Sequence, residues 1–181
     1  MRTKSSRQRR HARMDWQRIL VPVDFSESSV GALCHAVKLA SESGGSLIIV
    51  HVVPADYGWL GIGRNESRDL DRSLQRQAAS RLQDLADQHV DPKLAAELQV
   101  RIGQPATQIA AAATDSKCNL IVIATHGLTG LDRYLIGSVA DRVVRLAPCA
   151  VLLIPPARRP IIGTSPSQTV LRFRHKPKRD R

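Results

Sequence analysis

The sequence predicts an α/β fold, a doubly wound five-stranded parallel sheet of strand order 3-2-1-4-5 with helices on both faces. Two observations support this prediction. Short apolar runs rich in β-branched residues alternate along the chain with longer segments whose apolar residues recur at helical spacing. The runs are continuously apolar, which is typical of parallel strands buried on both faces. Sheets of this class bind ligands beyond the carboxyl ends of the strands, where the strand order reverses.

The first half of the domain predicts two strands and two helices. The run "RILVPVDF" (18–25) is apolar and β-branched, and it predicts a buried strand. Ser26 is a suitable cap for the helix that follows, and the glycines at 44–45 end that helix. The run "SLIIVHVV" (46–53) predicts the second strand, and an amphipathic helix is expected over 66–88.

The second half repeats this alternation. The run "AELQVRIG" (96–103) predicts the third strand, and Pro105 is well placed to begin an alanine-rich helix. The run "CNLIVIAT" (118–125) predicts the fourth strand, and the fourth helix is expected over 137–146. The run "CAVLLIP" (149–155) predicts the last strand, at one edge of the sheet.

Composition and charge divide the chain into one domain and two extensions. The 181 residues are 43% hydrophobic, which is enough for a single sizeable core. The net charge is +11, but residues 1–14 carry six Arg or Lys and no acid, and residues 157–181 carry eight against one Asp. The two ends together hold +13, which leaves −2 for residues 15–156. We therefore expect a folded domain over 15–156, with basic disordered extensions at 1–14 and 157–181.

The basic extensions have two interpretations. They could contact a polyanion, either nucleic acid or an anionic membrane surface, or they could simply be solvated. The start of the chain has no apolar segment after its basic residues, so we expect no secretory signal, with an organelle transit peptide as the alternative. No run reaches the roughly 18 apolar residues of a membrane span, so no transmembrane segment is expected.

The cysteines and histidines indicate neither disulfides nor a metal site. Cys34, Cys118 and Cys149 are scattered and form no CxxC pair. We expect them to be small buried side chains in a reducing compartment, and hence a cytoplasmic protein. The histidines show no HxxxH or HExxH spacing.

The segment "IVIATHGLTGLDRYLIGSVADRV" (121–143) has the order strand, glycine loop, helix. Its glycines allow tight turns and a close approach of backbone N–H groups to a ligand. Gly137-Ser138 falls at the expected helix N-terminus, where N–H groups and the helix dipole favour an anion. The sequence therefore predicts a phosphate-binding loop made from backbone, without the lysine of the familiar phosphate-binding loop.

Side chains of the same segment could assist. The hydroxyls of Thr129 and Ser138 can donate to phosphate oxygens, and Arg133 is the nearest cation along the chain. A magnesium ion near Asp24 could share the remaining charge. The alternative is a glycine turn followed by an ordinary serine at a helix start, with no ligand.

Three stretches resemble the universal stress protein family over about residues 15–156. They are "ILVPVDFSESS" (19–29), "GGSLIIVHVV" (44–53) and "ATHGLTGLDRYLIGSVADRVVRLAPCAVLLIP" (124–155). The nucleotide-binding branch of this family has the pattern G-x2-G-x9-G-S/T. Gly127 and Gly137-Ser138 match this pattern, whereas Ala124 replaces the first glycine.

The resemblance implies a site for ATP at the strand ends and the glycine loop. The residues implied for adenine and ribose are Pro22, Asp24 and Val52, and those for the pocket floor are Ile123 and Ala124. The residues implied for the phosphates are Gly127, Leu128 and Thr129 on one side and Gly137, Ser138 and Val139 on the other. The ordinary alternatives are strand-end packing for Pro22 and Val52, a helix cap for Asp24, and a loop-ordering hydrogen bond for His126.

These observations favour an ATP-binding regulatory or stress-response protein with at most slow hydrolysis. The segment after the first strand is "VDFSESS", which lacks the HxGH or SGGxDS motif of adenylating and nucleotidyl-transfer enzymes. The remaining alternative is a stress adaptor that binds no nucleotide and whose basic extensions contact nucleic acid or an anionic membrane. The apolar edge strand 149–155 and the family resemblance both predict a homodimer through that strand.

Overall fold

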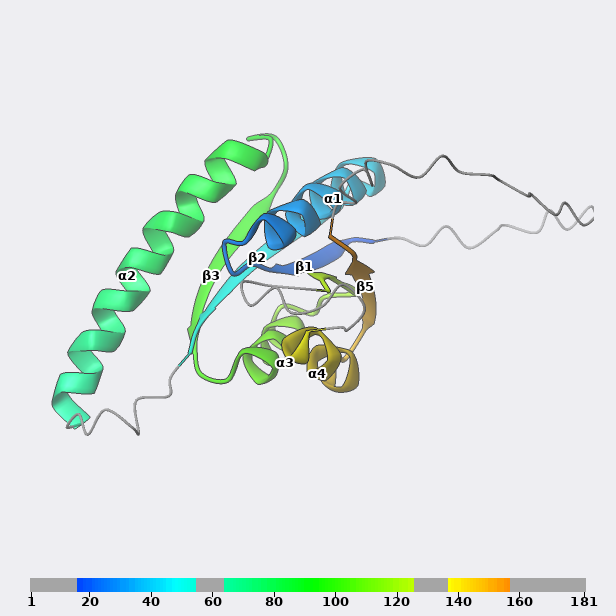
Figure 1. Cartoon of the computed structure of the whole chain (residues 1–181). Helices are drawn as coiled ribbons and strands as arrows, with labels where there is room; N and C mark the ends of the chain where they lie inside the picture. The colour runs from blue at the N-terminus through cyan, green and yellow to red at the C-terminus, as the bar shows by residue number, and fades with distance from the viewer. Residues whose placement is uncertain (1–15, 55–63, 126–136, 157–181) are drawn as a thin grey trace, which may run out of the picture.

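The structure is a computed structural model that describes residues 16–54, 64–125 and 137–156. These residues form one five-stranded sheet of order β3-β2-β1-β4-β5, in which every neighbouring pair of strands is parallel (Figure 1). The predicted fold class and strand order are confirmed. The extensions 1–14 and 157–181 lie outside the described residues.

Strands and helices alternate along the chain as predicted. The strands are β1 (Arg18–Pro22), β2 (Ser46–Val53), β3 (Ala96–Ile102), β4 (Leu120–Ala124) and β5 (Ala150–Ile154). The helices are α1 (Glu27–Ser43), α2 (Arg64–His89), α3 (Pro105–Asp115) and α4 (Ser138–Leu146). Within the described part of the chain, no helix is both long enough and apolar enough to cross a membrane.

The first and fourth strands are shorter than predicted, and left-handed residues explain why. β1 ends at Pro22 rather than at residue 25, because Phe25 has φ 65° and cannot continue an extended strand. β4 begins at Leu120 rather than at residue 118. Lys117 has φ 52°, and the N–H of Cys118 still donates to the carbonyl oxygen of Ala113 in α3, at 2.8 Å.

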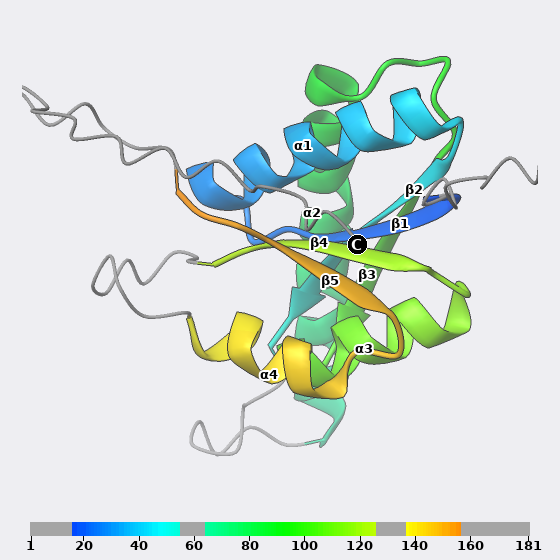
Figure 2. The same ribbon diagram turned by 90° about the vertical axis from the view of Figure 1, so that its right-hand side faces the viewer.

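The sheet lies between two layers of helices, with α1 and α2 on one face and α3 and α4 on the other (Figure 2). Successive strand residues alternate between the two faces. Ile19 and Val21 of β1 belong to the cluster under α1 and α2, while Leu20 belongs to the cluster under α3 and α4. Strand residues at the centre of the sheet are therefore buried whichever way they point, and this explains the continuously apolar runs.

Local sequence signals fix the ends of two helices. The Ser26 side chain accepts a hydrogen bond from the N–H of Ser29 at 3.2 Å and so caps α1. Gly44, with φ 70°, ends the same helix in the left-handed conformation. Pro105 is the first residue of α3, and the side chain of Gln104 caps that helix.

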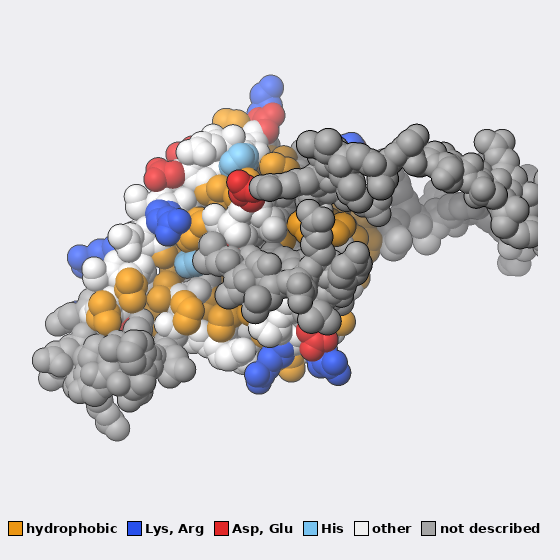
Figure 3. Space-filling view, viewed as in Figure 1, with side chains coloured by type: hydrophobic (Ala, Val, Ile, Leu, Met, Phe, Trp, Pro, Cys, Tyr) orange, Lys and Arg blue, Asp and Glu red, His pale blue; other side chains and the backbone are white. Residues whose placement is uncertain are grey.

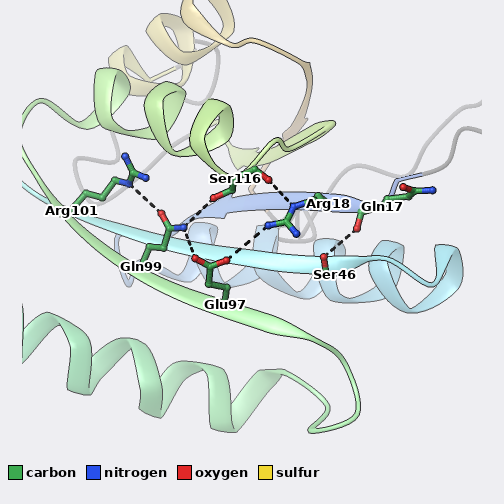
Figure 4. A network of polar contacts seen from close by, with 7 residues as sticks. All are labelled: Gln17, Arg18, Ser46, Glu97, Gln99, Arg101 and Ser116. Carbon is green, nitrogen blue, oxygen red and sulfur yellow. Dashed lines mark hydrogen bonds and ion pairs between the residues drawn. The ribbon is translucent and has the colours of Figure 1, made fainter.

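The edge strand β3 carries a polar network on the face shared with α3 (Figure 4). The Gln99 amide donates to Glu97 at 2.8 Å and to the Ser116 hydroxyl at 3.0 Å. Arg101 donates to Gln99 at 3.1 Å, and Arg18 of β1 donates to the Ser116 carbonyl at 2.6 Å. The outermost strand on this side therefore keeps a polar face, and its side chains tie β3 to β1 and to the end of α3.

We predict that two glycines, Gly31 within α1 and Gly45 just after it, respond oppositely to replacement by alanine. A Cβ at Gly45 would overlap the carbonyl oxygen of Trp16, which is backbone and cannot easily move. Gly45→Ala should therefore lower the free energy of unfolding by about 1–3 kcal/mol, the usual range for overpacked sites. Gly31→Ala is the control, because a Cβ there meets nothing within 4 Å, and it should stabilise by about 0.5–1 kcal/mol. Urea unfolding followed by circular dichroism measures both, and equal stabilities would contradict the prediction.

Candidate functional site

The candidate site lies at the carboxyl ends of β1 and β4, where the strand order reverses. β1 pairs with β2 on one side and with β4 on the other, so the chain leaves these two neighbouring strands in opposite directions across the sheet. Most of the predicted site residues are described at this edge. Gly127, Leu128 and Thr129, like His126 and Arg133, lie outside the described residues.

The start of α4 is fixed beside the end of β4. The N–H of Gly137 donates to the carbonyl oxygen of Thr125 at 2.7 Å, and the N–H of Thr125 donates to Ile154 of β5 at 2.9 Å. Because the amide of Gly137 is already used, its predicted contact with phosphate cannot involve its own N–H. Anion contacts would instead use the next N–H groups, those of Ser138 and Val139, because the first turn of a helix offers them no intrahelical acceptor.

Gly137 is the N-cap of α4, and it makes no side-chain cap. Its φ of −58° and ψ of 148° are open to any residue, so glycine is not required here by the backbone conformation. A missing side chain does, however, leave the helix start accessible, and both Ser138 and Val139 are exposed. α1 and α3, by contrast, have side-chain caps from Ser26 and Gln104.

Asp24 orders the turn between β1 and α1, but the residue that caps α1 is Ser26 and not, as the alternative for Asp24 proposed, Asp24 itself. Its Oδ1 accepts hydrogen bonds from the N–H of Ser26 at 3.0 Å and from the Ser26 hydroxyl at 2.5 Å. Its own N–H donates to the hydroxyl of Ser29 at 3.3 Å. The carboxylate is half-buried, so one of its oxygens is held in place by the protein itself.

The remaining predicted residues are buried at strand ends, but on different faces of the sheet. Val52 and Ile123 belong to the cluster under α3 and α4, whereas Ala124 belongs to the cluster under α1 and α2. Pro22 is also buried. The methyl group at Ala124, where the family pattern has glycine, therefore packs on the opposite face from Val52 and Ile123.

A second group of residues at this edge was not predicted. Phe25 stacks against His51 with ring centroids 4.5 Å apart, and the Arg81 guanidinium lies 4.1 Å from the centre of the Phe25 ring. His51 Nδ1 donates to the carbonyl oxygen of Val23 at 2.8 Å, since a carbonyl can only accept. The one feature of the sequence that could have indicated this group is His51, which interrupts the apolar run 46–53.

These three side chains border a hollow of about 170 Å³ between α2 and the ends of β1 and β2. Figure 3 shows hydrophobic side chains gathered between the lower half of α2 and the end of β2. They include Val53, Leu74 and Ala78. The stack offsets part of the cost of the left-handed Phe25, which for such residues is of order 1–3 kcal/mol, and it holds α2 against the turn that contains Asp24.

Comparison with known proteins identifies the family. The sequence profile of the Universal stress protein family matches residues 15–155. The chain belongs to the universal stress protein family. Universal stress protein MJ0531 of Methanocaldococcus jannaschii is 34% identical over 145 residues, which cover 77% of this chain and 82% of that protein. The resemblance seen in the sequence motifs is confirmed.

Solved structures show the same fold. The MJ0577 protein of the same organism matches this universal stress protein with a TM-score of 0.71 at 23% identity, covering 80% of this chain and 99% of that one. A universal stress protein in complex with cAMP matches with a TM-score of 0.53 at 24% identity, covering 77% and 97%. At these identities the two structures establish the shared fold alone.

The thiols of this universal stress protein lie away from the candidate site. Burial raises the pKa of Cys118 to about 11, and burial also raises the pKa of Cys149. Cys118 lies just before β4 and Cys149 just before β5, so both are at the amino ends of the strands, whereas the site is at the carboxyl ends. Our prediction that all three cysteines are buried is correct for Cys118 alone. Cys149 is half-buried, and Cys34 lies on the exposed side of α1 with its Sγ 4.0 Å from His89 Nδ1.

We predict a measurable coupling between Arg81 and Phe25 in this universal stress protein. A cation–π contact at an exposed site is worth about 0.5–1 kcal/mol, so a double-mutant cycle of Arg81→Gln with Phe25→Leu should return a coupling energy of that size. Arg76→Gln is the matched control, because Arg76 is an exposed arginine of the same helix. Its cycle with Phe25→Leu should give a coupling close to zero by urea unfolding. Equal coupling in the two cycles would show that the stack does not fix α2.

Proposed function

We propose that this universal stress protein is a cytoplasmic, homodimeric regulatory protein that binds ATP or a related adenine nucleotide at the carboxyl ends of β1 and β4. The observation that carries the proposal is the start of α4. It is fixed to β4 through Thr125, it is capped by a glycine without a side chain, and it exposes Ser138. Family membership and a relative of the same fold in complex with cAMP support it.

The phosphates would lie at the first turn of α4. Its N–H groups and the helix dipole favour an anion, and the exposed Ser138 hydroxyl can donate to a phosphate oxygen. A glycine at 137, where the backbone does not require one, is explained by a ligand that approaches the helix start closely. Gly127, Leu128 and Thr129 would complete the phosphate site, while Pro22, Asp24 and Val52 would line the adenine and ribose.

The proposed role is binding rather than rapid turnover. Asp24 Oδ1 already accepts two hydrogen bonds from Ser26, which makes the carboxylate a poor general base for a water molecule. Magnesium fits this arrangement only together with the nucleotide. The described residues contain no group of three or more metal-binding side chains, so phosphate oxygens would supply most of its ligands and Asp24 would be the candidate carboxylate. The three free thiols are consistent with a reducing compartment such as the cytoplasm.

A second candidate function is a stress adaptor without nucleotide. The observation that favours it is the segregation of charge, since residues 1–14 and 157–181 hold +13 while residues 15–156 hold −2. In that case the basic extensions would contact nucleic acid or an anionic membrane, and affinity would fall steeply with salt.

We predict that ATP binding depends on Ser138. Ser138→Ala removes a charge-assisted hydrogen bond worth about 1.5–3 kcal/mol, so the Kd for ATP with magnesium should rise about 10-fold to 100-fold by calorimetry. Ser41→Ala, at an exposed position of α1, is the control and should leave the Kd unchanged. Ala124→Gly should change the Kd less than about threefold and instead lower stability by about 1 kcal/mol, because its methyl group packs in the core. No binding heat in the unmodified protein would favour the adaptor.

We predict a dimer through β5. This edge strand exposes Leu152 (38%), and α4, which packs on one face of the sheet, exposes Val139 (37%), Val144 (48%) and Leu146 (46%). Leu152→Glu should convert the dimer to a monomer in light scattering at micromolar concentration. This position is a cleaner test than Leu153, which packs against the core. Ser41→Glu should leave the dimer intact, and a monomeric unmodified protein would contradict the prediction.

A further inference from the structure

A second hollow lies at the other end of the strands, the amino ends, beside the point where α2 ends and β3 begins. This point is at the top of Figure 1. We call it the α2–β3 hollow. Its volume is about 450 Å³, and its apolar lining includes Ala86, Val90, Leu94 and Leu98. Ala86 and the partly buried Val90, Leu94 and Leu98 also pack against the core, so this lining is a fixed part of the fold.

Two exposed carboxylates, Asp87 and Asp91, also line the α2–β3 hollow. Asp87 accepts a hydrogen bond from the Gln83 amide at 2.8 Å, and Asp91 accepts one from the N–H of Lys93 at 2.8 Å. Across the part of the chain that the structure describes, neither carboxylate forms an ion pair with a cationic side chain. The hollow therefore combines an apolar lining with uncompensated negative charge.

The chain's own N-terminal segment has the complementary chemistry. Residues 1–14 contain six Arg or Lys and no acid. Long cationic side chains lay their aliphatic stems on apolar surface while their charged ends reach outward. Stems on Val90 and Leu94, with charged ends beside Asp87 and Asp91, would satisfy both features of the hollow.

The entry point of this segment is close to the hollow. The Gln17 carbonyl accepts from Ser46 at the start of β2 (2.8 Å), and the Ala95 carbonyl accepts from Leu47 (2.9 Å). Only β2 therefore separates the start of β1 from the start of β3, a distance of about 10 Å at the usual strand spacing of about 4.8 Å. An extended chain spans about 3.3 Å per residue, so residues 1–14 reach the hollow easily. Residues 157–181 instead follow β5, at the far edge of the sheet and at the carboxyl ends of the strands.

We propose that residues 1–14 dock in cis on the α2–β3 hollow, with their cations beside Asp87 and Asp91. A short tether keeps the local concentration of the segment near the millimolar range, so that individually weak ion pairs suffice to hold it. The contact occupies cationic side chains that would otherwise face solvent or an external polyanion. It is governed by charge and therefore weakens as salt is added.

The test uses the amide NMR resonances of Val90, Leu94 and Leu98 in the full chain at low salt. Changing Lys4, Arg7, Arg9 and Arg10 to Gln should shift these resonances. The matched control neutralises four cations of the other extension, by changing Arg172, Arg174, Lys176 and Lys178 to Gln, and it should leave them in place. In about 0.5 M NaCl, where the Debye length is below about 5 Å, the difference between the N-terminal variant and the unmodified chain should largely disappear.

A second comparison tests the hollow itself. In an Asp87→Asn, Asp91→Asn background, the shifts caused by neutralising the N-terminal segment should fall by more than half. Asn retains an acceptor for the Lys93 N–H, so the turn at Asp91 is kept. Asp84→Asn, an exposed position on the same helix that does not line the hollow, should leave the shifts at full size.

Three results would overturn the proposal. If the amide resonances of the hollow do not shift when the N-terminal cations are replaced, residues 1–14 do not dock on the α2–β3 hollow. Resonances that respond to the C-terminal substitutions would assign the hollow to residues 157–181. Shifts that grow with protein concentration would show that the contact forms between copies rather than in cis.

Discussion

Burial of the central strands on both faces is the constraint on which the rest of the structure depends. β1 and β4 contribute fully buried side chains to both apolar clusters, and apart from Arg18 at the start of β1 every residue of these two strands is apolar. Parallel neighbours also require a helical connection between them, and these connections cover both faces of the sheet. Polar side chains are therefore confined to the strand ends and to the outermost strands, and the candidate site lies at one of those ends.

The ends of β1 and β4 differ in how many of their polar groups are hydrogen-bonded within the protein. At β1 the carboxylate of Asp24 is used by Ser26, and at the start of α1 the serine hydroxyl caps the helix. At α4 the N–H of the capping residue Gly137 donates to the Thr125 carbonyl, its carbonyl accepts from the N–H of Asp141, and no side chain caps the helix. The two sides of the candidate site therefore differ: the β1 turn is held by its own hydrogen bonds, whereas under the proposed function an external acceptor would complete the hydrogen bonding at the α4 start.

The sequence was sufficient for the parallel order because unbroken apolar runs and helical spacing are local signals. The sequence was less informative where the backbone dihedral angle of one residue decides where a strand ends and which way a side chain points. Nothing in "VDFS" indicated that Phe25 takes a left-handed conformation, which ends β1 early and turns its ring towards His51 and Arg81. The exposure of Cys34 escaped prediction for a related reason, since its spacing from the apolar residues of α1 places it on the solvent side while composition alone suggests burial. Contacts between residues distant in sequence, such as Phe25 and Arg81, leave no local signal.

The two outer strands of the sheet have opposite surface chemistry, and this bears on how large an assembly can grow. β5 is short and apolar beside the exposed residues of α4, whereas β3 presents Glu97, Gln99 and Arg101 in a hydrogen-bonded row. A sheet with two apolar edges could add copies at both ends without limit and grow into a fibre. Under the proposed association through β5, each copy would bury its apolar edge strand and leave the polar β3 edge facing outward, so growth would stop at a closed pair of copies.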